Sequence, residues 1–393
     1  MSSVRYFGLC LVVVMTLVLT GTSCRPSLAP PAGQELPTAS TEIDMDKLRD
    51  RIDAVLDYTL ANRRLNTKDH AAWQILHGAL AYQAVFPVEN DGKYVSAVQH
   101  VLDGGKMEGW TMERGSPLPF VGADGEKRYG LRALLEQGTK TGQGHNDQWL
   151  AILSQCNLSP ETTIQFDGNE YTVADFVGQV QLDLSRNFDH EYSWTLIALT
   201  AYLPTTTSWV DSAGKQWSIP GLVQAEVDHG FGSGACGGTH RLIGLSMALN
   251  RHTAQNGEMT PEWVAADDRI QEAIRKAREY QNPNGALSSN YFLRPGSSPD
   301  LAEDIGTTGH TLEFLSLSLT EEELNKPWVA RAAQHMCKVF EQTEGAPLEC
   351  GALYHAAHGL VLYRERVFGP REYKFELTAD PGASTSIAPA ERS

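Results

Sequence analysis

The sequence predicts an all-α protein, an (α/α)6 toroid of six helix pairs, and two observations carry this prediction. Short apolar segments that open with a histidine or an aromatic residue recur along the chain with a spacing near 47 residues and two longer intervals, which indicates repeated helix pairs. These segments start at His77, His145, Tyr192, His240, His310 and His355. Between them lie amphipathic segments with charged faces, typical of outer helices.

The first 23 residues are typical of an export signal. Arg5 precedes an apolar run that ends near Thr20, and small residues follow up to Cys24. Cys24 resembles the lipid-modified cysteine of bacterial lipoproteins, although the leucine usual three positions earlier is Gly21 here. Two interpretations stay open, a lipid anchor on Cys24 or a cleaved signal beside an incidental cysteine. We expect an exported protein in the periplasm or cell envelope that contacts the membrane only through its N-terminus.

Composition limits the possible partners and sets the domain boundaries. The formal charge of −16, with no basic block, argues against nucleic acid and against adsorption to an anionic membrane. We expect a Pro-rich flexible tether over 24–42, one toroid domain over 43–369 and a disordered tail over 370–393. Cys10 lies in the expected signal. The four cysteines after Cys24, either buried free thiols or disulfide partners, are Cys156, Cys236, Cys337 and Cys350.

Local signals place the outer helices and the turns between helices. Apolar residues at helical spacing predict a helix over 43–60, and Thr260-Pro261-Glu262 starts a second one that runs to about Tyr280. Thr320 and Glu323 form a capping box that starts a third helix extending through Val339. Gly-bearing turns near 122–129, 166–173 and 211–219 predict small β flaps, each between an inner helix and the next outer helix.

Two resemblances to known toroids follow from short motifs. The stretch Gln281-Asn-Pro-Asn-Gly285 resembles the helix-to-loop turn of terpenoid cyclases and protein prenyltransferases. Over 45–369 the chain also resembles a family of uncharacterised bacterial exported toroid proteins, through Thr308 to Glu313 and His355 to His358. These likenesses imply a fold and no activity. The acid motif of the cyclases and the zinc site of the prenyltransferases are both missing, since 265–268 matches the former only in part.

A third resemblance suggests acid/base chemistry. Gly309-His310-Thr-Leu-Glu313 resembles the Gly-His-x-x-Glu segment of the N-acylglucosamine and cellobiose 2-epimerases, and Tyr354-His355-Ala-Ala-His358 partly matches their late Tyr-His-x-x-Arg segment. The resemblance implies that His310 and His355 exchange a proton at a sugar carbon and that Glu313 supports His310. His358 occupies the position of the arginine, which puts that substrate contact in doubt.

We expect the inner-helix starts to gather at one mouth of the toroid, where a long irregular segment over 284–304 would cover them. Imidazoles at helix starts suit proton transfer near neutral pH, whereas histidines that only brace the helices are the alternative interpretation. Tryptophans there could stack on sugars or simply pack in the core. The candidate catalytic residues are His240, His310, Glu313 and His355, and the candidate binding residues are His145, Trp149, Trp194, Asp304 and His358.

The resulting functional prediction is an exported, envelope-associated protein that binds a small-molecule or carbohydrate ligand at the toroid mouth. The alternative is a cofactor-free, epimerase-like enzyme that acts on carbohydrates. We assign no cofactor and no metal, although Cys236 and His240 with Cys350 and His355 could form a zinc site like that of the lanthionine cyclases, without their adjacent Cys-His pair. An open cavity between His310 and His355 would favour the enzyme, and sealed packing would oppose it.

Overall fold

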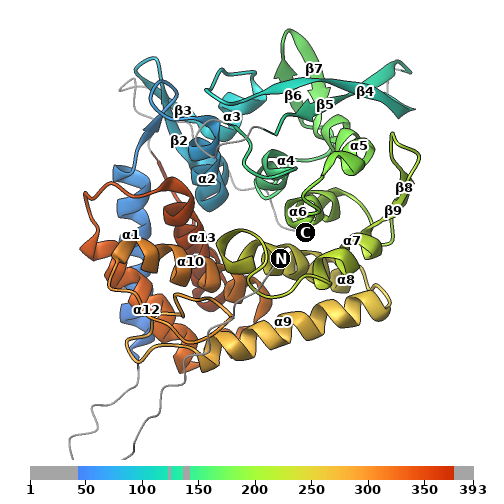
Figure 1. Cartoon of the computed structure of the whole chain (residues 1–393). Coiled ribbons are helices and arrows are strands. Elements are labelled where there is room, and N and C mark those ends of the chain that lie inside the picture. Colours follow the sequence, from blue (N-terminus) through green and yellow to red (C-terminus); the bar gives the residue numbers. More distant parts are fainter. Residues whose placement is uncertain (1–42, 123–124, 136–141, 376–393) are drawn as a thin grey trace, which may run out of the picture. The chain divides into compact units, whose positions relative to one another are not determined.

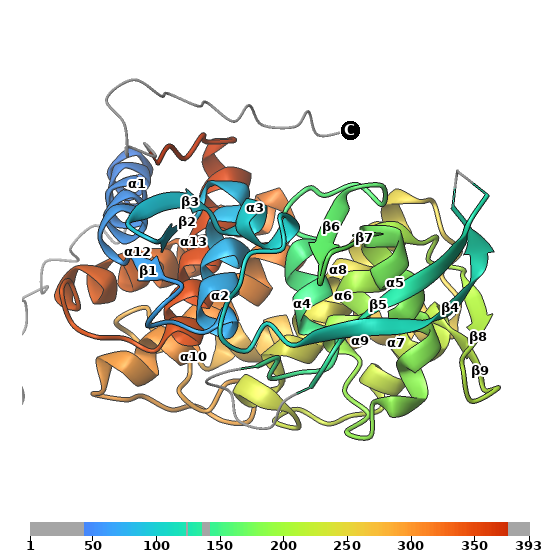
Figure 2. The ribbon, with the colours of Figure 1, turned by 90° about the horizontal axis from the view of Figure 1, so that it is seen from above.

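A computed structural model describes residues 43–122, 125–135 and 142–375, which belong to the unit Ile43–Ser393 (Figures 1 and 2). This described part is mostly helical, with thirteen α-helices and nine short strands, so the expected helical class is confirmed. The expected export signal, the tether, Cys24 and most of the expected tail lie outside the described residues. None of the described helices is both long enough and apolar enough to span a bilayer.

The helices alternate between mainly apolar and amphipathic ones along the chain. The α-helices are α1 (Met45–Asn62), α2 (Ala72–Tyr82), α3 (Ala97–Leu102), α4 (Gln148–Leu153), α5 (Val173–Asp183), α6 (Ser193–Tyr202), α7 (Ile219–Val227), α8 (Thr239–Ala254), α9 (Pro261–Glu279), α10 (Leu301–Ser318), α11 (Glu321–Leu324), α12 (Pro327–Gln342) and α13 (Cys350–Phe368).

Six helices contact one another in a closed series. Helix α2 packs against α4, α4 against α6, α6 against α8, α8 against α10 and α10 against α13, and α13 packs back against α2. Every residue of α4, most residues of α6 and two thirds of the residues of α10 are buried, as expected for helices with neighbours on several sides. The more amphipathic helices lie outside this group: α1 contacts α12 and α13, α7 contacts α9, and α12 contacts α10.

Two of the amphipathic segments show how local sequence sets helix boundaries. Thr260 is the N-cap of α9 and Pro261 its first residue, as predicted. The capping box of Thr320 and Glu323 is also present, but it starts the short helix α11. The long helix α12 starts only at Pro327, because a residue that precedes proline is disfavoured in the helical region and Lys326 is extended. The predicted single helix from Thr320 to Val339 is therefore two helices.

The described part also contains four small sheets. The hairpins are β4 (Met112–Val121) with β5 (Lys127–Ala133), β6 (Thr163–Phe166) with β7 (Asn169–Thr172), and β8 (Ser208–Val210) with β9 (Gln216–Ser218), while β1 (Leu65–Asn66), β2 (Pro87–Asn90) and β3 (Lys93–Ser96) form a three-stranded sheet. Asp167 and Gly168 connect β6 to β7 with positive φ, as their hairpin signal predicts.

The predicted flap positions are only partly right. The hairpins β6–β7 and β8–β9 each lead into an outer helix, α5 and α7. The stretch 122–129, of which 123–124 lie outside the described residues, instead joins two strands of the hairpin that precedes the inner helix α4. The sheet β1–β2–β3 was not predicted, although Asp91-Gly92 is a hairpin signal of the same kind.

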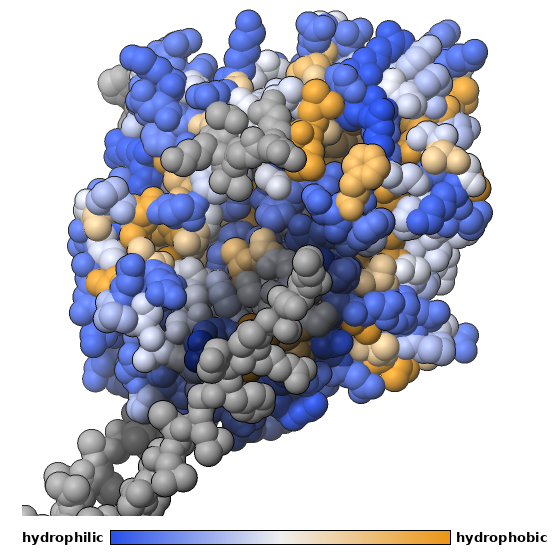
Figure 3. All heavy atoms as spheres, in the orientation of Figure 1, coloured by the Kyte–Doolittle hydropathy of each residue, from blue (hydrophilic) through white to orange (hydrophobic). Residues whose placement is uncertain are grey.

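The surface agrees with the acidic composition. In the view of Figure 3 hydrophilic residues dominate, with scattered apolar residues between them.

Among the described cysteines, Cys156, Cys337 and Cys350 are buried, Cys236 is half-buried, and all four are free. The structure therefore agrees with the interpretation of these cysteines as unpaired thiols.

Candidate functional site

Five histidines from five different segments converge in the interior of the described fold. They are His77 on α2, His145 before α4, His240 on α8, His310 on α10 and His355 on α13. Ring centroids lie 4.2 Å apart for His310 and His355 and 5.3 Å apart for His240 and His355. His145 lies 5.3 Å from His240, and His77 lies 5.3 Å from His355. We call these five residues the histidine centre.

The histidine centre lies deeper than the predicted mouth. His145 and His240 are near the starts of their helices, as expected. His310 is more than two turns into α10, and His77 and His355 are more than one turn into α2 and α13. His77, which the sequence showed only as one of the repeated helix markers, belongs to the site as well.

Four of the five rings have their Nδ1 atom fixed by an oxygen acceptor. The Nδ1 of His77 bonds the carbonyl of Trp73 at 2.7 Å, and that of His310 bonds the carbonyl of Gly306 at 2.7 Å. His355 donates to Glu313 at 2.7 Å, and His145 to Glu191 at 2.9 Å. Because these oxygens only accept, Nδ1 carries the proton and each Nε2 keeps its lone pair. Histidines that bind metals are oriented in this way.

His240 differs from the other four. His240 is only 6% exposed, and within the described part neither of its ring nitrogens has a hydrogen-bond partner. Burial, together with the neighbouring histidines, lowers the pKa of His240 well below its usual value, so the ring is neutral. A buried polar group without a partner costs roughly 1–3 kcal/mol. An unpaired imidazole in this position is therefore a candidate ligand for a bound group.

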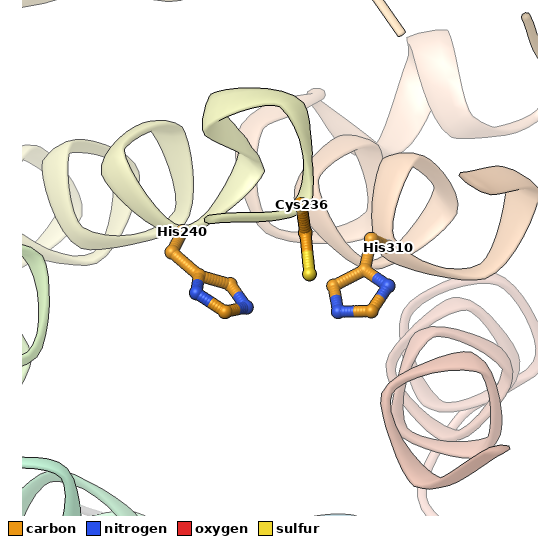
Figure 4. A group of neighbouring side chains, drawn as sticks. All are labelled: Cys236, His240 and His310. Atoms are coloured by element: carbon orange, nitrogen blue, oxygen red, sulfur yellow. The ribbon is translucent and has the colours of Figure 1, made fainter. Parts of the chain in front are cut away.

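A thiol completes a group of three ligand atoms. Donor atoms of Cys236, His240 and His310 lie within 4.8 Å of one another, and Figure 4 shows the three side chains directed into the same space. Burial raises the pKa of the Cys236 thiol to about 12 in the absence of a cation. A metal ion would displace that proton, because the thiolate is the form that coordinates.

The backbone around Cys236 is held in an unusual conformation. Cys236 has a φ of 49°, inside the 3-10 turn Ala235–Gly238 of a glycine-rich loop. Gly237, also at positive φ, has no room for a side chain, because a Cβ atom would lie 2.2 Å from the ring of Tyr291. Tyr291 belongs to the segment 284–304 that was expected to cover the site. Strained residues held by their surroundings cluster at functional sites.

Glu313 has different partners from the predicted one. Its two carboxylate oxygens accept hydrogen bonds from Nδ1 of His355 and Nδ1 of His358, each at 2.7 Å, whereas His310 bonds a backbone carbonyl. Burial would raise the pKa of Glu313, but these two histidines lower it more, so it is ionised. Glu313 therefore orients His355 and His358 and joins α10 to α13.

The remaining predicted residues divide into two groups. Trp194 belongs to the site, since its ring lies 5.1 Å from His240 and its indole nitrogen is buried without a partner among the described residues. Trp149 is fully buried and packs against Trp110, in agreement with the core-packing interpretation. Asp304 bonds His335 at 2.6 Å and joins α10 to α12 away from the histidine centre.

The free space at the histidine centre is small. A cavity of about 10 Å³ is lined by Trp194, His240, Glu313 and His355 together with four further residues, and this volume holds about one water molecule. His310 and His355 are only 3% and 2% exposed. The cavity suits an ion or a water molecule, and a sugar ring does not fit in it. By the criterion set from the sequence, this packing opposes the carbohydrate enzyme.

Comparisons of the chain with protein-family models, with curated proteins and with solved structures find no match. The resemblances to terpenoid cyclases, to exported toroid proteins and to the 2-epimerases therefore stay predictions. Function is argued below from the geometry of the histidine centre.

Proposed function

We propose that the protein is an exported, envelope-associated (α/α)6 toroid protein that binds a metal ion of the zinc class through Cys236, His240 and His310. The observation that carries the proposal is the buried His240 ring, which lacks any partner in the described part and lies beside a thiol and a free imidazole nitrogen. The closed series of contacts from α2 through α13 and back to α2 supports the toroid. The sequence supports the location through the expected export signal, with its apolar run before Cys24.

The ligand types select the metal. Thiolate and imidazole are the ligands that Zn²⁺ takes in proteins, at distances near 2.0–2.3 Å. The three donor atoms lie within 4.8 Å of one another, so an ion placed between them reaches all three after small side-chain movements. His310 is already oriented, because its Nδ1 bonds the carbonyl of Gly306 and leaves Nε2 for the ion.

Three protein ligands leave one position of a tetrahedral zinc ion open, as in catalytic sites. The cavity lined by His240 and His355 has room for one water molecule beside the ligand His240. His355 is held by Glu313 with its Nε2 lone pair free, so it is placed to accept a proton from such a water. Binding of the ion is the proposed function, and water activation is the chemistry that this arrangement would support.

Metal binding can be tested with protein freed of metal by chelation. We expect Zn²⁺ to bind with micromolar or tighter affinity by calorimetry, and Co²⁺ to give an absorption band from thiolate-to-metal charge transfer. Cys236→Ser should abolish that band and His240→Ala should weaken binding at least tenfold. Cys350→Ser is the matched control, because Cys350 lies beside Gln74 and outside the ligand group, and it should behave as the wild type.

Two outcomes would contradict the proposal. One is a folded wild-type protein, judged by circular dichroism, that retains no Zn²⁺ or Co²⁺ after dialysis. The other is binding that Cys350→Ser removes and Cys236→Ser preserves, which would place the ion at Cys350 and away from Cys236.

The second candidate function is acid/base catalysis on a carbohydrate, which would require the cavity at the histidine centre to open, because a sugar ring does not fit in it as it stands. The short distance between the His310 and His355 rings, with Glu313 bonded to His355, favours it. Turnover of an envelope sugar by metal-free protein, lost in His310→Ala, would support this candidate. Equal turnover by wild type and variant would exclude a role for His310.

A further inference from the structure

We infer that a second metal ion binds on the other side of His240, at His145 and Glu191, and that the imidazole of His240 bridges the two ions. This inference rests on the proposed function, because His240 is also a ligand of the ion at Cys236 and His310. It adds a second site with its own ligands and with access from solvent.

The first observation is a second group of ligand atoms that shares His240. Donor atoms of His145, Glu191 and His240 lie within 4.8 Å of one another. The rings of His145 and His240 are nearly perpendicular, with centroids 5.3 Å apart. Glu191 lies in the loop before α6 and His145 in the segment before α4, so this group approaches His240 from different elements than Cys236 and His310.

The second observation is the orientation of the His240 ring. Figure 4 shows one ring nitrogen turned toward Cys236 and His310 and the other turned away from them. Both nitrogens are buried, and among the described residues neither is hydrogen-bonded. One ion explains one unpaired nitrogen. A second ion explains the other.

The third observation is an unpaired carboxylate oxygen. Oε2 of Glu191 accepts a hydrogen bond from Nδ1 of His145, while Oε1 is buried and has no partner within the described part. An ion at this site would take the place of that hydrogen bond: it would bind Nδ1 of His145 and Oε1 of Glu191, and the imidazole proton of His145 would move to Nε2. The donors of the second site would be Oε1 of Glu191, Nδ1 of His145 and the outward nitrogen of His240.

This donor set has a defined chemistry. Two imidazoles and one glutamate bind zinc at catalytic sites and leave positions for water or substrate. The side chains of His145 and Glu191 are 19% and 15% exposed, in contrast to the buried His240. An external ligand would therefore meet the second ion, and the first ion would stay enclosed.

The charges of such a centre also balance. When His240 coordinates both ions it releases its one N–H proton to solvent, and Cys236 releases its thiol proton. Two divalent ions then face three negative groups, which are the thiolate, the imidazolate and the carboxylate of Glu191. The fourth negative charge is the ionised Glu313, which is hydrogen-bonded to His355 of the histidine centre. No oxidant or further reactant is required.

The number of ions bound by the full-length, metal-free chain tests this inference. Titration with Zn²⁺, followed by metal analysis after dialysis, should give two ions per wild-type chain and one per Glu191→Gln chain. This variant keeps the size of the side chain and should leave the Co²⁺ charge-transfer band of Cys236 unchanged. Glu258→Gln, on an exposed glutamate, is the matched control and should keep two ions.

Each alternative result separates this inference from the proposed function. Saturation at one ion in both wild type and Glu191→Gln would refute the second site and leave the first intact. If the wild type binds only one ion and Glu191→Gln weakens the binding of that ion, a single ion uses both ligand groups. That result would refute the bridge. Failure to bind any ion would contradict the proposed function itself.

Discussion

Helices α9 and α10 follow each other along the chain and differ in what they bury. The buried residues of α9 are all apolar, among them Trp263 and Ile270, and its other face is largely charged. Helix α10 is buried on nearly every side and includes buried polar residues such as Asp304, His310 and Glu313. The first helix stabilises the fold by removing apolar surface from water. The second carries a buried polar network, which stabilises the fold only when every hydrogen-bond partner is present.

This difference separates two kinds of substitution. A truncation in α9 should reduce the free energy of unfolding and leave the histidine centre unchanged. A truncation in α10 should disturb stability and site together, because Glu313 joins two histidines of α13 to α10.

The largest effect is expected for Glu313→Ala. Removing this carboxylate leaves the ring donors of His355 and His358 unpaired in the interior, which should lower the free energy of unfolding by about 3–5 kcal/mol. Urea denaturation of the metal-free protein measures the change. Glu279→Ala, on an exposed glutamate of α9, should change stability by less than about 0.5 kcal/mol. Equal effects of the two substitutions would contradict the distinction between the helices.

A smaller effect is expected for Ile270→Ala on α9. Ile270 is 3% exposed, and its truncation should cost about 2–3 kcal/mol, the lower part of the range for such changes, because an outer helix can relax into the space. Val264→Ala on the exposed face of the same helix should cost less than about 0.5 kcal/mol. Metal binding by both variants should match the wild type. Weaker metal binding by Ile270→Ala would show that α9 also supports the site.

The smallest effect, taken per unit of pH, comes from the protonation of His77. Burial, reinforced by neighbouring His355, lowers the pKa of His77 to about 3. The folded state keeps His77 neutral, while the unfolded chain takes up a proton below about pH 6.5. The free energy of unfolding should therefore fall as the pH drops from 6.5 toward 3, with about 1.4 kcal/mol per pH unit from His77.

The substitution His77→Phe isolates this contribution. Urea denaturation of metal-free protein between pH 7 and 4.5 should give a pH slope smaller by about that amount than in the wild type. The exposed His190, replaced by Gln, is the control and should leave the slope unchanged. Identical slopes for wild type and His77→Phe would show that His77 takes up a proton over the same pH range in the folded protein as in the unfolded chain, which would contradict the expected effect of burial.

Much of the fold could be predicted because its information is local. Apolar spacing, the cap at Thr260 and the turn at Asp167-Gly168 act over a few residues, and each gives the expected element. The prediction of one long helix after Thr320 was wrong, because it did not take into account Pro327, which starts a new helix. The spacing near 47 residues also indicated which segments meet in the interior.

The site could be predicted only in part. The repeat spacing predicted that His145, His240, His310 and His355 converge, and their rings do lie close together. The partner of Glu313 could not be predicted, because helix spacing relates it to His310 and only packing brings α13 to it. Cys236 and Glu191 reach His240 through irregular loops, whose backbone angles leave no periodic signal.

The packing of α13 has a consequence for how the protein is made. This last described helix contacts α1, α2 and α10, and Arg364 on it pairs with Asp53 on α1. Its His355 and His358 hold Glu313 in place. A nascent chain that lacks α13 can form its local helices but cannot assemble the histidine centre. We expect premature termination before Cys350 to give a chain with helical spectra and an incomplete interior, so synthesis of the final helix sets the earliest moment at which the site exists.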